Sequence, residues 1–291
     1  MSSAGPEIRE PSVAGSFYPA RPEGIRQMVD ACLEAAGEPP PGDRPIGALV
    51  PHAGLVYSGS IAAAGWRALL RDAGAEPTIV ILGTNHSAWF DGVAVFDAGA
   101  WRTPIGDVAV DDSVATGILA LGAPFAANRA GHRGEHSIEV QLPIVATLRP
   151  GARIVPCSVS AGTGRDAIEA GTQLGTLLAD LRARGREVLL AISTDMAHYP
   201  SHDEAVGVTS RLVPAIVALD PVALAVREHA ESQSGVRGMA CGMCGIQPTV
   251  LGLAALRSMG ATGGVVAGAA TSADAGAEPD RTVGYLTVAF A

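Results

Sequence analysis

Short, uninterrupted runs of apolar residues alternate with amphipathic helical patterns along this chain, and this alternation restricts the fold more than any other feature. The runs are residues 46–50 (IGALV), 78–83 (TIVILG), 92–96 (GVAVF), 152–160 (ARIVPCSVS) and 187–194 (EVLLAIST). Continuous hydrophobicity over a few residues is typical of strands that are buried on both faces. We therefore predict an α/β fold with a central, mostly parallel or mixed sheet that helices cover on both faces.

The segments around these strands carry apolar residues at helical spacing. Helices are expected at residues 21–36, 58–74, 111–122, 136–151, 166–185, 203–219, 221–230 and 244–260. Pro143 lies inside the fourth segment, where its missing N–H predicts a kink or a break. Residues 263–272 and 281–291 are expected to form the last strands. A length of 291 residues can bury one large core, so we expect a single domain over residues 1–291.

Charge, hydropathy and missing motifs argue against several classes of function. The net charge of −9 argues against sequence-independent nucleic-acid binding, which needs a basic face. No segment approaches the roughly 18 apolar residues of a membrane helix, and the first residues lack a signal-peptide pattern. We therefore expect a cytoplasmic protein with neither nucleic acid nor membrane as a partner. The sequence also lacks the GxxxxGK[ST], GxGxxG and G-x-S-x-G motifs of nucleotide and acyl-transfer sites.

Polar side chains follow three of the predicted strands, at the point where each strand ends. His52 comes after IGALVP, and His86 comes after TIVILGTN. Asp195 and His198 come after EVLLAIST. Ligands of α/β sheets bind outside the carboxyl ends of the strands, so these side chains are expected to meet there. One such histidine is more often a buried imidazole that bonds to backbone, but three at equivalent positions indicate a metal site.

A thiol from the turn RGMACGMCGIQP (237–248) could complete this site. The turn contains C-x-x-C, formed by Cys241 and Cys244. A zinc knuckle would need a second ligand pair at short spacing, and the context of a thioredoxin-like motif is absent. One thiolate that joins the distant histidines is the remaining interpretation. The N-terminus of the following helix would favour such a thiolate.

The segment GHRGEHSIEVQLP, at residues 131–143, supplies weaker candidates. On a helix, His136 and Glu139 would share a face, as a ligand pair, as support for ligands or as a solvated helix start. His132 and Glu135 are expected in a loop or in the first helical turn. The segment therefore leaves three interpretations open.

Taken together, these motifs resemble those of the MEMO family, whose bacterial and archaeal members are often called AmmeMemoRadiSam system protein B. The motifs are PSVAGSFYP, VPHAGLVYSG, LGTNHS, EHSIEVQLP, STDMAHY and CGIQP, in order from about residue 11 to the C-terminus. The resemblance implies an α/β fold related to class III extradiol ring-cleaving dioxygenases, which use non-haem Fe(II). It also implies a metal site of two histidines and one cysteine, with an aspartate and a third histidine nearby.

Carried over by motif, the metal ligands of this chain are His52, His86 and Cys244. Cys244 fits the family's C-G-x-x-P pattern. Cys241 does not, because no proline lies four residues after it, and it is interpreted as a packing residue. The glycines of VPHAGLVYSG, Gly54 and Gly59, are expected to let the loop after His52 turn tightly beside the metal.

Two functions are consistent with these residues. The first is a non-haem Fe(II)-dependent oxygenase or related redox enzyme. Its catalytic candidates are His198 and Asp195. His198 would act as acid/base, and Asp195 would orient His198 or a metal-bound water. A thiolate ligand would also tolerate Cu or Zn, and the fold relationship does not establish ring cleavage. The second is a non-catalytic metal-binding or peptide-binding adaptor. The resemblance to the family implies AMMECR1-like and radical SAM proteins as its partners. Candidate pocket residues are His136, Glu139, Tyr57 and Tyr199.

Overall fold

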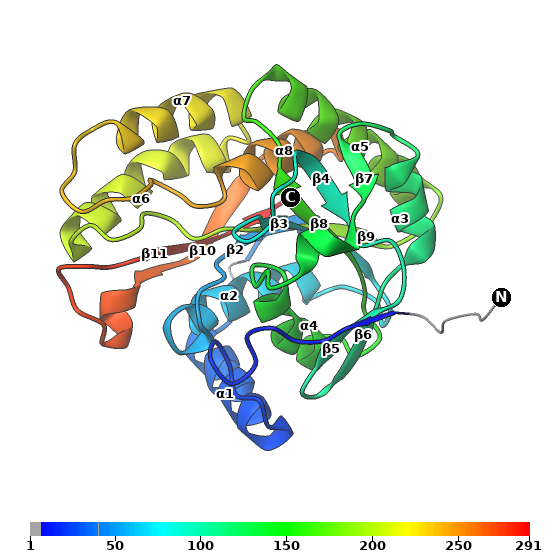
Figure 1. Ribbon diagram of the computed structural model, residues 1–291, viewed down its shortest axis with the longest axis horizontal. Coiled ribbons are helices and arrows are strands. Elements are labelled where there is room, and N and C mark those ends of the chain that lie inside the picture. Colours follow the sequence, from blue (N-terminus) through cyan, green and yellow to red (C-terminus); the bar gives the residue numbers. More distant parts are fainter. Residues whose placement is uncertain (1–6, 40) are drawn as a thin grey trace.

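An eight-stranded mixed sheet forms the centre of the computed structural model, which describes residues 7–39 and 41–291. In spatial order its strands are β10 (Gly264–Thr271), β11 (Gly284–Phe290), β2 (Gly47–Val50), β9 (Val188–Ser193), β3 (Thr78–Thr84), β8 (Arg153–Ser160), β4 (Gly92–Val95) and β7 (Phe125–Ala127) (Figure 1). The four inner strands β2, β9, β3 and β8 are parallel. β11 and β4 pair with them in the antiparallel direction. The mixed sheet with a parallel centre agrees with the prediction.

The inner strands are apolar throughout because both of their faces are covered. Every residue of β2, β3 and β9 is buried. Successive side chains of a strand point to opposite faces, so Leu49 enters one core whereas Ala48 and Val50 enter the other. Two hydrophobic cores therefore lie back to back across one sheet.

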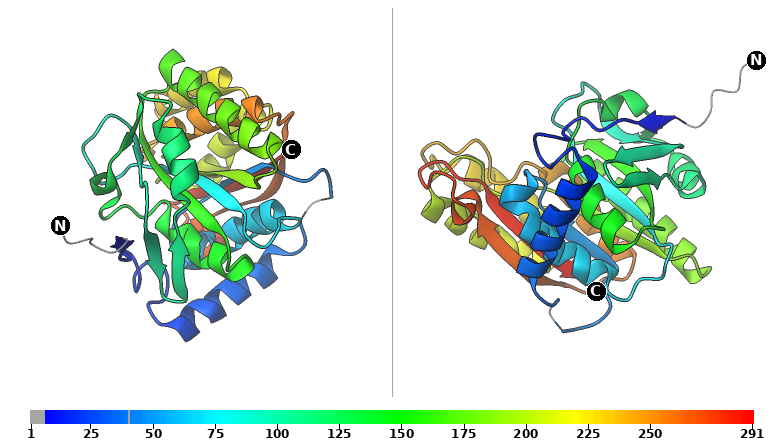
Figure 2. Two further views of the ribbon diagram at one scale, coloured as in Figure 1. Left: turned by 90° about the vertical axis from the view of Figure 1, so that its right-hand side faces the viewer. Right: turned by 90° about the horizontal axis from the view of Figure 1, so that it is seen from below.

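Helices cover both faces of the sheet, as predicted (Figures 1 and 2). One face carries α3 (Asp112–Leu119), α5 (Arg165–Ala183), α6 (His202–Val217), α7 (Pro221–Ser232) and α8 (Ile246–Ser258). The other carries α1 (Pro22–Ala36), α2 (Leu55–Leu70) and α4 (Leu142–Leu148). None of these helices, within the residues that the structure describes, is long and apolar enough to cross a membrane. The architecture is a single α/β domain with helices on both faces of a mixed sheet.

A second, three-stranded sheet was not predicted. It contains β1 (Ile8–Arg9), β5 (Ala100–Thr103) and β6 (Gly106–Ala109), in the order β1-β5-β6. Trp101 and Val108 of this sheet are buried in the same core as α1, α2 and α4. The small sheet therefore extends that core toward the N-terminal segment.

The helix predicted at residues 58–74 begins earlier, at Leu55. The loop after His52 is correspondingly short, and Gly59 lies inside α2 rather than in the loop. A Cβ atom at Gly59 would lie 2.4 Å from Sγ of Cys32 in α1. The prediction that Gly59 lets the loop turn is therefore wrong, because this glycine serves the close packing of α2 on α1.

The helix predicted at residues 136–151 is wrong in its first part. Residues 136–138 are not helical, and a 3-10 turn, η2 (Glu139–Gln141), precedes α4. Pro143 lies in the first turn of α4. A backbone N–H in the first turn of a helix has no acceptor within that helix. Proline, which lacks this N–H, can therefore start the helix without kinking it.

Candidate metal centre

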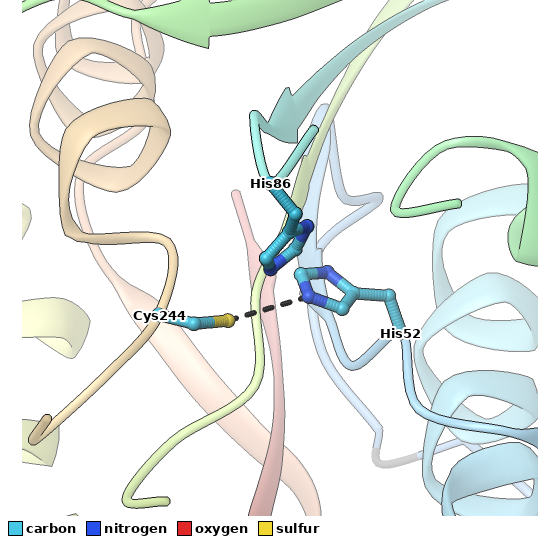
Figure 3. A group of neighbouring side chains, drawn as sticks. All are labelled: His52, His86 and Cys244. Atoms are coloured by element: carbon cyan, nitrogen blue, oxygen red, sulfur yellow. Dashed lines mark hydrogen bonds between the residues drawn. The ribbon is translucent and has the colours of Figure 1, made fainter. Parts of the chain in front are cut away.

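Three loops bring His52, His86 and Cys244 together at the carboxyl edge of the parallel strands (Figure 3). His52 lies two residues after β2, His86 two residues after β3, and Cys244 two residues before α8. One donor atom of each side chain lies within 4.8 Å of the other two. Sγ of Cys244 is 3.3 Å from Nε2 of His52. The three side chains predicted as ligands therefore face one another, although they are far apart in the sequence.

His52 is buried, and its hydrogen bonds define its tautomer. Its Nδ1 lies 3.0 Å from Oγ of Ser193, whose own hydroxyl donates to the carbonyl of Ser137. The Ser193 oxygen must therefore accept from Nδ1–H, which leaves the lone pair of His52 on Nε2, toward Cys244. Burial, followed by the nearby charges of His86 and His136, lowers the pKa of His52 well below its usual value. His52 is thus neutral at pH 7, which is the form that binds metals.

Cys244 lies against the end of β9. Its Sγ accepts a hydrogen bond from the backbone N–H of Asp195 at 3.3 Å. Burial, together with the charge of Asp195, raises the pKa of the Cys244 thiol. A transition metal displaces the proton of a thiol that it binds, so metal binding here would release a proton.

His86 lies on a more open loop, where its side chain is 32% exposed. Its Nδ1 lies 3.0 Å from Oε1 of Glu135, and its backbone N–H donates to Oε2 at 2.6 Å. Its ring packs edge-on against His52, with 5.2 Å between the ring centroids. Burial would raise the pKa of Glu135, but hydrogen bonds from His86 and from the backbone N–H of Ser137 lower it well below its usual value. Glu135 is therefore a buried carboxylate.

The sequence assigned Glu135 only to a loop or a first helical turn, so its contact with His86 was missed. Its one sequence signal is its position directly before His136 in the EHSIEVQLP motif. His86, Glu135 and His136 form a second group whose donor atoms lie within 4.8 Å. The carboxylate already accepts backbone N–H groups from His86, His136 and Ser137. We therefore interpret this group as support for His86 and not as a separate metal site.

His136 is the third imidazole of the cluster. Its ring stacks on His86 with 4.6 Å between the centroids, and Phe17 packs on it at 4.8 Å. Glu139 does not share a face with His136, because residues 136–138 are not helical. The Glu139 carboxylate is fully buried and accepts hydrogen bonds from Arg9 and from the hydroxyl of Tyr18. The structure therefore places His136 beside the candidate ligands and Glu139 outside the site.

Asp195 links the loops that carry two of the candidate ligands. It is 3% exposed, its Oδ1 accepts the backbone N–H of His52 at 2.7 Å, and its own N–H donates to Cys244. Burial raises the pKa of Asp195, although the charge of His198 opposes this shift. Nδ1 of His198 lies 2.8 Å from the carbonyl of Met196 and must donate to it. The imidazole is thus oriented by that carbonyl, and no hydrogen bond joins Asp195 to His198 among the described residues. The alternative, that Asp195 orients a metal-bound water, stays a prediction.

The two tyrosines predicted to line the pocket are both exposed. Tyr57, in the first turn of α2, is 42% exposed. Tyr199 is 39% exposed, has a φ of 72° and lies under the guanidinium of Arg281 at 4.2 Å.

The backbone carbonyl of Cys241 accepts the N–H of His198, and burial raises the pKa of the Cys241 thiol to about 11. Cys241 belongs to neither group of potential ligands among the described residues.

Two imidazoles and a thiol form a donor set that suits transition metals. Fold and site together define an α/β protein with a His/His/Cys candidate metal centre at the carboxyl edge of its sheet. The chain belongs to the Memo-like protein family, whose sequence model matches residues 9–289. The resemblance found in its motifs is therefore confirmed over nearly the whole chain.

Relatives of similar length occur in archaea and bacteria. A MEMO1 family protein of Methanopyrus kandleri is 34% identical, over 97% of this chain and 98% of its own length. A MEMO1 family protein of Aquifex aeolicus is 32% identical, over 97% of this chain and 99% of its own length. The crystal structure of an uncharacterized protein from Escherichia coli K12 superimposes with a TM-score of 0.51 at 16% identity, covering 84% of this chain and 99% of that one. This last similarity supports the fold alone.

Proposed function

We propose that this protein is a metal-dependent redox enzyme that binds Fe(II) through His52, His86 and Cys244. The observation that carries the proposal is the convergence of their donor atoms within 4.8 Å. Three protein ligands leave further coordination positions open, as catalytic metal sites do and closed structural sites do not. The thiolate makes the site softer than a site with two histidines and a carboxylate, so Cu and Zn are competing metals.

The chain's own residues would support redox chemistry in specific ways. A bound Fe(II) would supply the electrons that O2-dependent or related redox reactions need. His198 donates from Nδ1 to a carbonyl, which leaves the Nε2 lone pair available to accept a proton. Asp195 would hold the backbone of His52 and contact Cys244, and so would keep two ligands in place.

A second candidate function is a non-catalytic metal-binding or peptide-binding adaptor. It is favoured by the aromatic side chains near the site, because Trp89, three residues after His86, is fully exposed. Tyr57, in the first turn of α2, and Tyr199, which directly follows His198, are also exposed. Large exposed aromatic groups beside an open site suit a ligand or a partner. AMMECR1-like and radical SAM proteins stay predicted partners, and the cytoplasm stays the predicted location.

The test is metal binding by anaerobically purified protein that is reconstituted with Fe(II). Loss of a residue that hydrogen-bonds to a metal ligand lowers metal affinity by roughly 10- to 100-fold. We expect His52→Ala and Cys244→Ser, which remove a ligand itself, to lower the affinity for Fe(II) by more than this. Cys241→Ser is the matched control, because it removes a neighbouring thiol that lies outside both groups of potential ligands. It should retain wild-type stoichiometry and affinity.

Oxygen consumption separates the two candidate functions. The enzyme requires O2 uptake or another redox reaction that the Cys244→Ser variant lacks. Tight metal binding without redox activity toward any candidate substrate would favour the adaptor. A wild-type protein that binds neither Fe(II), Cu nor Zn would contradict the enzyme and the metal-binding form of the adaptor.

A further inference from the structure

Glu135 brings a fully buried carboxylate into contact with an exposed metal-ligand candidate. Its side chain has no exposed surface, whereas the His86 side chain is 32% exposed. Oε1 lies 3.0 Å from Nδ1 of His86 and accepts the backbone N–H groups of His136 and Ser137 at 2.8 and 2.9 Å. Oε2 accepts the backbone N–H of His86 at 2.6 Å. The carboxylate therefore contacts both the ring and the main chain of one residue.

We propose that Glu135 is the positioning residue of the metal centre, which fixes the ring orientation and the tautomer of His86. This inference rests on the proposed metal binding. An ionised carboxylate can only accept, so the proton of His86 must lie on Nδ1. The lone pair then lies on Nε2, the ring nitrogen on the side of His52 and Cys244 (Figure 3).

The carboxylate also fixes the loop from which His86 projects. It connects the residues after β3 to the segment 135–137, which is 49 residues further along the chain. A second bond joins the same two segments, because Oγ of Ser137 donates to the carbonyl of Thr84 at 2.7 Å. The rings of His52 and His136 pack against His86, but among the described residues only the Glu135 carboxylate forms a hydrogen bond to its ring and so fixes where Nδ1 points. Glu135 thus acts on the metal through His86 and does not bind it.

The two imidazole ligands differ in what holds them. Nδ1 of His52 bonds to the neutral hydroxyl of Ser193, whereas Nδ1 of His86 bonds to a carboxylate. A hydrogen bond to a charged acceptor is stronger, and a carboxylate partner raises the basicity of a ligating imidazole. We therefore expect His86 to be the stronger donor of the two when metal binds.

Glu139 offers a matched control in the same segment. Its carboxylate is also fully buried and also accepts backbone N–H groups, from Ser12 and Val13. Its charged partner, however, is Arg9 and not a metal-ligand candidate. Replacing either glutamate by glutamine removes one buried negative charge, but only Glu135→Gln changes the partner of His86.

The experiment compares wild type, Glu135→Gln and Glu139→Gln with Co(II) as the metal probe. Competition titrations give the Co(II) affinity, and absorption spectra report the ligand geometry. Long-range ¹H–¹⁵N spectra of the metal-free proteins report the tautomer of His86. We expect Glu135→Gln to weaken Co(II) binding by about 10- to 100-fold, to alter the spectrum and to populate both tautomers. Glu139→Gln should keep the wild-type Co(II) spectrum and the single Nδ1–H tautomer.

Wild-type affinity and a wild-type tautomer in Glu135→Gln would overturn the inference, as would an equal loss in Glu139→Gln. Should Glu135→Gln not fold, Glu135→Asp retains the charge with a shorter reach. It should keep the Nδ1–H tautomer, and a mixture of tautomers in Glu135→Asp would count against the inference. The tautomer is measured without metal, so it decides the role of Glu135 even if wild type fails to bind Co(II), a result that would contradict the proposed function alone.

Discussion

At the scale of single residues, burial keeps two histidines of this protein neutral. His52 and His132 are buried, and burial lowers the pKa of both. A neutral buried imidazole is suited to a metal when its lone pair faces other donors, as at His52. At His132 the neutral ring packs against aromatic side chains and bonds to a backbone carbonyl.

His132 gives a prediction about acid stability. Its ring packs against Phe96 and Trp101, its Nε2 lies 3.0 Å from the carbonyl of Ala94, and burial lowers its pKa from 6.5 to about 4. Because the folded state binds this proton less readily than the unfolded state, the stabilisation is complete above about pH 6.5 and is lost as the pH falls toward 4. The shift corresponds to about 3 kcal/mol.

The measurement is the free energy of unfolding by urea between about pH 7 and pH 4. We expect wild type to lose up to about 3 kcal/mol more than His132→Gln over this range, because glutamine cannot take up the proton. The amide of glutamine retains a donor for the carbonyl of Ala94. Parallel curves for the two proteins would refute this role of His132.

At the scale of elements, the packing of α5 on α8 places the thiol of the site. Cys244 lies two residues before α8, so a shift of this helix moves the thiol. The two helices approach through glycine, since a Cβ atom at Gly175 would lie 2.2 Å from the carbonyl oxygen of Ala255. Gly171 is equally close to the carbonyl of Leu251. These glycines of α5 therefore set how closely α8 packs against α5.

We predict that Gly175→Ala destabilises the protein by about 1–3 kcal/mol through overpacking, in spite of the roughly 1 kcal/mol that alanine gains in helix propensity. Gly117→Ala in α3 is the control, because its Cβ would meet Leu177 at an ordinary 3.6 Å. That variant should be more stable than wild type by about 0.5–1 kcal/mol. Denaturant unfolding measures both, and stability changes of the same sign would contradict the packing argument.

At the scale of the whole molecule, a buried ion pair holds the N-terminal segment against the rest of the fold. Nη1 of Arg9 lies 2.7 Å from Oε2 of Glu139, with side-chain exposures of 8% and 1%. The guanidinium also packs over the ring of Trp101 at 4.1 Å. Further along this segment, Phe17 accepts the N–H of Leu55 at the start of α2. The segment therefore closes the core beside the loop that carries His52.

We expect Arg9→Met to destabilise the protein by about 3–5 kcal/mol, because it leaves the Glu139 carboxylate buried without its cation. Hydrogen–deuterium exchange should rise in residues 8–18, where Glu139 accepts two backbone N–H groups. Arg102→Met is the control, since the ion pairs that Arg102 forms among residues 7–39 and 41–291, with Glu10 and Asp107, are exposed. It should change stability little. Similar effects of both variants would show that burial of the Arg9 pair is unimportant.

Much of the fold and part of the site follow from local patterns. A strand buried on both faces must be apolar at every position, so IGALV and EVLLAIST predicted inner strands of the sheet. The carboxyl ends of parallel strands share one edge, so His52 and His86 could be placed together before any coordinates. The choice of Cys244 over Cys241 came from the family pattern alone, because both thiols lie in the same glycine turn.

Other features depend on contacts between residues that are distant in the sequence. Glu135 contacts His86 across 49 residues, and Glu139 contacts Arg9 across 130, so neither pairing leaves a periodic signal nearby. Helical spacing placed His136 and Glu139 on one face, but the bonds that Glu135 makes to the backbone hold residues 136–138 outside any helix. The sequence by itself therefore determined which strands are buried and where they deliver the ligands. Only the tertiary structure decided which buried carboxylate supports the site, because that choice depends on packing between segments and not on the pattern within one.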